Sequence, residues 1–216
     1  MVNAPKRART DAQKQTRRRI ILTAAEAHLA EVGFESFSMV VLARIIDMAK
    51  GTLYLYFETR DHLLLALFCE KLEQCSVKFI AALPEAASDH EFVSIYYDTL
   101  FTDPVYLALV SRLESVIEHN VSTAELVISK QMMLETITRM ATSVSERLSL
   151  TQPQSVDVII SCASLWLGTA QSDTGPKVAE EAIPEDVKQM MQQFSARNVF
   201  ITNACRILNG IRTNVQ

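Results

Sequence analysis

The sequence predicts an all-α protein with a small basic N-terminal domain and a larger acidic C-terminal domain. Apolar residues recur every three or four positions along most of the chain, and no stretch alternates in the manner of a strand. Five glycines and six prolines among 216 residues are too few for turn-dense β-sandwiches. The net charge of −4 divides into +4 over residues 1–60 and −8 over the remainder. This asymmetry indicates a local contact with a polyanion, with a solvated basic tail as the alternative.

The first sixty residues predict an arm and three short helices. We expect a basic flexible arm over residues 1–16 and a helical domain over 17–60. The first helix should end at Gly33, which suits a left-handed C-terminal position. Ser38 is a suitable N-cap for a second helix reaching about residue 46, and a third should follow over about 49–57.

The second and third helices have the size of a helix-turn-helix. Leu53 and Phe57 lie four residues apart and should point inward, whereas Thr52, Leu55 and Tyr56 should point outward. The hydroxyl groups can donate to phosphates or base edges, and Leu55 could contact thymine methyl groups. The alternative is an aromatic helix packed inside a core.

This region resembles the tetracycline-repressor (TetR) family of bacterial regulators. The resemblance rests on Gly33-Phe34, on the run from Lys50 to Phe57, and on Asp61 with the leucines after it. It covers about residues 17–66. It implies an N-terminal three-helix helix-turn-helix DNA-binding domain and a larger C-terminal helical ligand-binding and dimerisation domain over 61–216.

The resemblance also implies which residues approach DNA. Arg60 would meet a phosphate, and the basic arm could follow the backbone or enter the minor groove. The full predicted set is Arg17, Arg18, Ser38, Arg44, Lys50, Gly51, Thr52, Tyr54, Leu55, Tyr56 and Arg60. Two positions depart from the family pattern: Asp47 stands where a small residue or glycine is usual, and Ala49 where Ser or Thr often caps the third helix.

Longer helices are predicted beyond residue 60. The first should begin after Thr59 and reach about Leu83, before Pro84. Further helices are expected at about 89–101, 104–119, 122–149, 153–171 and 184–210, with a loop over 172–183.

The last two helices carry apolar residues at alternating spacings of four and three, which is typical of a coiled-coil seam. We expect a four-helix interface between two copies of the chain, with burial inside one copy as the alternative. The predicted interface residues are Val158, Cys162, Leu165, Thr169, Phe194, Asn198, Ile201 and Cys205. A dimer predicts two recognition helices about one DNA turn apart and a palindromic operator.

Aromatic and methionine residues in the middle helices suit a pocket for a small hydrophobic effector, although such residues also make an ordinary core. The candidate lining is Phe68, Leu72, Tyr97, Phe101, Arg112, Met133, Ile137 and Trp166.

No catalytic or metal motif emerges, so neither an enzyme nor a cofactor is predicted. The four cysteines show no CxxC pairing, and no export signal or membrane span is expected, which favours the cytoplasm. We therefore predict a homodimeric DNA-binding transcriptional regulator, acting as a repressor released by a small molecule. The alternative is a helical module that binds another protein through its apolar second helix.

Overall fold

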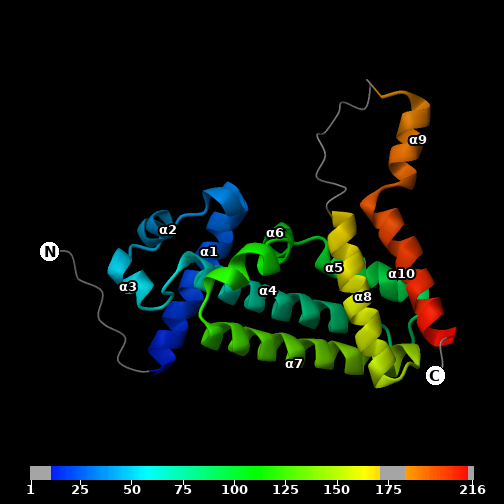
Figure 1. Cartoon of the computed structure of the whole chain (residues 1–216), viewed down its shortest axis with the longest axis horizontal. Helices are drawn as coiled ribbons and strands as arrows, with labels where there is room; N and C mark the ends of the chain where they lie inside the picture. Colours follow the sequence, from blue (N-terminus) through cyan, green and yellow to red (C-terminus); the bar gives the residue numbers. More distant parts are fainter. Residues whose placement is uncertain (1–10, 171–182, 214–216) are drawn as a thin grey trace. The chain divides into compact units, whose positions relative to one another are not determined.

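A computed structural model describes residues 11–170 and 183–213, and every regular element in these ranges is a helix, as predicted. Figure 1 follows them along the chain. The elements are α1 (Asp11–Ser36), α2 (Met39–Ile45), α3 (Lys50–Tyr54), α4 (Arg60–Ala82), α5 (Asp89–Leu100), α6 (Pro104–Val110), α7 (Thr123–Leu148), α8 (Gln152–Ala170), α9 (Glu185–Gln193) and α10 (Ala196–Thr213), with a π turn at Leu113–Ile117 and a 3₁₀ turn at Glu118–Asn120.

The described residues divide into two compact units that are not continuous in sequence. The first combines residues up to 71 with 104–131, and the second combines 72–103 with the described residues after 131. Both α4 and α7 contribute residues to each unit. The boundary at residue 60 stays a prediction for the functional domains.

The first unit has its core where the apolar faces of α1, α2, α3 and α4 meet. Ile21, Leu42, Leu53, Phe57 and Leu63 are all completely buried there. Gly33 interrupts α1 with a φ of 77°, which an L-residue with a side chain rarely adopts. The predicted break at this glycine is therefore confirmed, although the helix resumes for one more turn.

The second unit is organised around α10, which packs against α8 and α5 (Figure 1). Phe200 on α10 is completely buried and stacks on Tyr96 of α5 at 5.9 Å between ring centroids. Arg212 at the end of α10 pairs with Asp89 of α5 at 2.7 Å. Aromatic contacts and an ion pair therefore connect α10 to α5.

Several predicted helix limits were wrong. The first helix begins at Asp11, so residues 11–16 of the predicted arm are helical. Residues 1–10, and all of the predicted loop over 172–183 except its last residue, lie outside the described residues. The helix expected over 104–119 ends at Val110, and that over 184–210 is interrupted after Gln193. No Gly or Pro lies at either break, so no local signal in the sequence indicates them.

Candidate nucleic-acid interface

The helix α2, the turn after it and the helix α3 form a helix-turn-helix. Ser38 caps α2, since its hydroxyl accepts from the Val41 amide at 3.5 Å. The turn closes with the Met48 amide donating to the Ala43 carbonyl at 2.9 Å. Asp47 has a φ of 47° in this turn, and Asp tolerates that left-handed conformation better than most residues. An aspartate can therefore occupy this position of the turn, which glycine would also suit.

The third helix is shorter than predicted, since it ends at Tyr54, but the side chains of α3 and of the three residues after it have the predicted orientation. Leu53 and Phe57 are completely buried, whereas Leu55 is 80% exposed. Thr52, Tyr54 and Tyr56 are half-buried and Lys50 is exposed; the Lys50 ammonium lies 5.7 Å from the Tyr54 ring centroid. A cation, hydroxyl groups and one apolar side chain are therefore presented together.

The first turn of α3 has no side-chain cap. Ala49 occupies the N-cap position with φ −60° and ψ 135°, and its methyl group accepts no hydrogen bond. A Cβ built on Gly51 would meet nothing within 4 Å. Open space at this turn lets another molecule approach the backbone closely.

A hollow of about 680 Å³ lies between the start of α1 and the helix-turn-helix. Lys14, Arg17 and Arg18 give it positive charge, and Asp47 brings one carboxylate. The other lining residues are Gln15, Ile20, Ile46, Met48, Thr52, Leu55 and Tyr56. The cations of α1 thus share one surface with Thr52 of α3 and with Leu55 and Tyr56 directly after it.

Arg18 and Arg60 have contacts that the sequence did not reveal. The Arg18 guanidinium lies 4.5 Å from the Phe57 ring centroid, and burial lowers its pKa. Arg60 donates to the carbonyl oxygen of Phe34 and lies 4.5 Å from the centroid of that ring. Both cations are engaged inside the unit through aromatic faces, so their expected phosphate contacts would have to compete with these partners. Arg44 is exposed at the end of α2.

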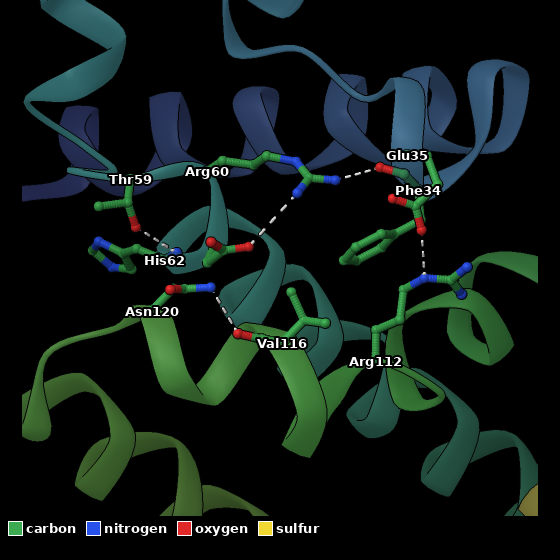
Figure 2. A network of polar contacts seen from close by, with 9 residues as sticks. Phe34, Glu35, Thr59, Arg60, His62, Arg112, Val116 and Asn120 are labelled. Carbon is green, nitrogen blue, oxygen red and sulfur yellow. Dashed lines mark hydrogen bonds and ion pairs between the residues drawn. The ribbon is translucent and has the colours of Figure 1, made fainter.

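Phe34 is also contacted by Arg112, which the sequence assigned to a ligand pocket (Figure 2). The Arg112 guanidinium lies 4.8 Å from the Phe34 ring centroid, and its Nε donates to Glu35 at 3.1 Å. Glu35 and Arg112 are 77 residues apart, and no local pattern indicates their pairing. Arg112 therefore connects the segment after α6 to the end of α1.

His62 links the end of the helix-turn-helix to α7. Its backbone amide donates to the Thr59 hydroxyl at 3.0 Å, as expected of a cap (Figure 2). Its Nδ1 lies 2.8 Å from Glu125, and its ring packs edge-on against Phe57 at 5.2 Å. Burial lowers the pKa of His62, while the charge of Glu125 opposes that shift. Next to it, burial raises the pKa of Asp61 against the effects of Arg60 and of a hydrogen bond from Asn120.

The other candidate ligand residues fall in both units. Phe68 stacks on Tyr106 at 5.8 Å in the first unit. In the second unit, Phe101 stacks on Tyr97 at 4.3 Å and meets Trp166 edge-on at 5.9 Å. Leu72 is buried, and Met133 and Ile137 are half-buried. The structure brings Tyr97, Phe101 and Trp166 into one aromatic cluster.

Half of the predicted dimer seam is buried within the chain itself. Val158, Cys162, Thr169 and Ile201 are at most 9% exposed, which is the alternative arrangement considered for them. The remaining four differ: Leu165 and Cys205 are half-buried, and Phe194 and Asn198 are exposed. The exposed face of α8 instead carries Ile160, Ala163, Ser164 and Gly168.

Within the described ranges, no group of three or more His, Cys, Asp or Glu residues is placed to hold a metal ion. None of the helices described is both long and apolar enough to span a membrane.

The geometry is that of a helix-turn-helix protein, and comparison with known families identifies the family to which the chain belongs. Residues 21–67 match the family model described as bacterial regulatory proteins, tetR family, and residues 68–213 match the tetracyclin repressor-like C-terminal domain. The chain therefore belongs to the TetR family, whose members are transcriptional regulators and not enzymes.

Individual relatives are more distant. The chain is 30% identical over 105 residues to the fatty acid metabolism regulator protein of Bacillus subtilis (strain 168), covering 47% of this chain and 54% of that protein. It is 38% identical over 65 residues to the HTH-type transcriptional repressor KstR of Rhodococcus jostii (strain RHA1), or 30% of each. The chain thus spans about half, or less, of the length of these curated relatives.

Solved structures support the fold. A TetR transcriptional regulator from Rhodococcus sp. RHA1 gives a TM-score of 0.58 at 16% identity, covering 94% of this chain and 100% of that one. The multidrug binding protein EbrR, solved with imidazole, gives the same TM-score and identity over 90% of this chain and 94% of its own.

Proposed function

We propose that this protein is a sequence-specific DNA-binding transcriptional regulator that reads its operator with α3. The observation that carries the proposal is the outward face of α3 beside the cationic start of α1. The cations would contact DNA phosphates and position the protein on the duplex. Base edges would contact Thr52, Tyr54, Leu55 and Tyr56, which would read the sequence. The helix α2 brings Arg44 to the same region.

Duplexes enriched from a random DNA library by the full chain provide the test. Affinity should fall steeply and linearly with salt on a double-logarithmic plot, since phosphate contacts release counterions. Thr52→Ala and Tyr56→Ala should each weaken binding without lowering thermal stability. Thr138→Ala is the matched control, because it removes an exposed hydroxyl on α7. Unchanged affinity in both the Thr52 and the Tyr56 variant would contradict the assigned recognition surface, which comprises α3 and the two residues after it.

A homodimer on a palindromic operator follows from this proposal. The exposed face of α8 supports it. Ala163, Ser164 and Gly168 are small enough to let two helices approach closely, Ile160 adds an apolar side chain that is 50% exposed, and twofold dimers are the commonest oligomers. Ser164→Arg should convert the dimer to a monomer in sedimentation velocity, whereas Thr138→Arg should not. An unchanged dimer in Ser164→Arg would exclude this face.

A repressor released by a small hydrophobic effector is the regulatory part of the proposal. The aromatic cluster of Tyr97, Phe101 and Trp166 supports a ligand site in the second unit, since apolar pockets with few polar groups suit such ligands. Consider an effector that binds more tightly to a conformation in which the two α3 helices of the dimer are wrongly spaced for DNA. Such an effector must weaken DNA binding by a free energy equal to its own preference for that conformation. Saturating effector should therefore lower operator affinity.

A protein-binding module is the second candidate, and the exposed apolar residues of α2 favour it. Val40, Val41 and Ile45 are 38%, 39% and 54% exposed. This alternative predicts that no DNA sequence is enriched at any salt concentration.

A further inference from the structure

Leu55 is the most exposed large apolar side chain among the described residues, at 80%. Single exposed apolar residues are common on protein surfaces and need no explanation by themselves. Leu55 differs because it stands at the C-cap of α3, beside Thr52 and Tyr56 on the lining of the hollow. An apolar group therefore lies within the surface proposed to read base edges.

The surroundings of Leu55 combine opposite chemistries. Lys14 and Arg17 line the same hollow as Leu55, and so do the apolar residues Ile20 and Met48. Ile20 is itself 52% exposed. A ligand that fits this surface must offer negative charge and an apolar group together. A DNA duplex does so, with phosphates along its backbone and methyl groups on thymine.

The major groove restricts what Leu55 can recognise. Each base presents hydrogen-bond donors and acceptors there, and the thymine C5 methyl is the one apolar group. A leucine side chain placed against a donor or acceptor would remove it from water without giving it a partner, which is unfavourable. Placed against a methyl group, both partners gain by burial.

We infer that Leu55 is a specificity-determining residue that recognises a thymine methyl group in each operator half-site. The inference rests on the proposed function, and adds to it the base and the chemical group that are read. It predicts an operator with a fixed thymine at one position of each half-site. Thymine is preferred over cytosine there because of its methyl group, in addition to any hydrogen-bonded readout by Thr52 or Tyr56.

The test replaces thymine by uracil, which removes only the methyl group. Each thymine of an enriched operator is replaced in turn, and the affinity of the full chain for each duplex is measured at fixed salt. At one position per half-site, uracil should weaken binding by about fourfold, the effect of losing one buried methyl group. In Leu55→Ala, the same substitution should change affinity by less than about twofold, because the partner of the methyl group is gone.

Two controls separate readout from folding and from general affinity. Leu55→Met keeps an apolar side chain and should retain sensitivity to uracil. Thr52→Ala should weaken binding to the thymine operator and to its uracil-substituted version by the same factor. The inference is overturned if no uracil substitution matters to the unaltered chain, or if Leu55→Ala keeps the full sensitivity. Absence of any enriched duplex would instead overturn the proposed function and this inference with it.

Discussion

The uncapped first turn of α3 gives a sharp test of how the recognition helix is held. Ala49 already has the extended backbone that an N-cap requires, with φ −60° and ψ 135°. A threonine there needs no backbone change, and its hydroxyl could accept from the Gly51 or Thr52 amide. Ala49→Val has nearly the same shape as Ala49→Thr but no acceptor, so it is the matched control.

The expected gain follows from capping energetics. Replacing alanine by a capping residue stabilises a helix by about 1 kcal/mol, and the effect should be local because α3 has only five residues. A gain of about 1 kcal/mol changes the ratio of closed to open α3 about fivefold. The amide hydrogens of Thr52 and Leu53, which bond to the Ala49 carbonyl at 2.8 and 3.2 Å, should then exchange about fivefold more slowly.

Hydrogen exchange measured by NMR on Ala49→Thr and Ala49→Val provides the assay. Operator affinity should rise by up to the same factor in the threonine variant if part of the binding energy is used to order α3. Equal protection in the two variants would refute the reasoning, because it would show that the helix start is held by packing of Leu53 alone.

Three further predictions concern charge, pH and the aromatic cluster. Asp47→Asn keeps a residue that tolerates positive φ and removes a carboxylate from the proposed DNA surface. Operator affinity should therefore rise by about two- to fivefold at low salt and by less at high salt. Weaker binding by the variant would contradict the placement of Asp47 beside the DNA phosphates. Burial lowers the pKa of His62 in the folded protein, so below the normal histidine pKa the unfolded chain binds more protons than the folded chain. The free energy of unfolding should therefore fall as the pH drops through about 6.5. His62→Gln should flatten this pH dependence in thermal melts, and an identical slope in the variant would exclude His62 as its source. Trp166 is the single tryptophan, is 2% exposed and contacts the Phe101 ring. A ligand that enters the aromatic cluster should therefore shift the tryptophan fluorescence emission. A bound effector that leaves the emission spectrum unchanged would show that the pocket lies elsewhere.

The sequence predicted those features that depend on residues close together in the chain. The helical class follows from apolar spacing, the break at Gly33 from its freedom at positive φ, and the cap at Ser38 from its hydroxyl. The outward position of Leu55 follows from its register against Leu53 and Phe57. Each of these is decided within one or two helical turns.

Other features were decided only by contacts between distant parts of the chain. Arg18, Arg60 and Arg112 were expected at DNA or ligand, yet each lies over an aromatic ring in the first unit. A long cationic side chain can reach many partners, and its sequence neighbours do not indicate which ring folding will bring beside it. In the same way, Val158 and Cys162 share a spacing that suits either a dimer seam or an internal contact. Packing of α8 against α10 within the chain buries these two residues.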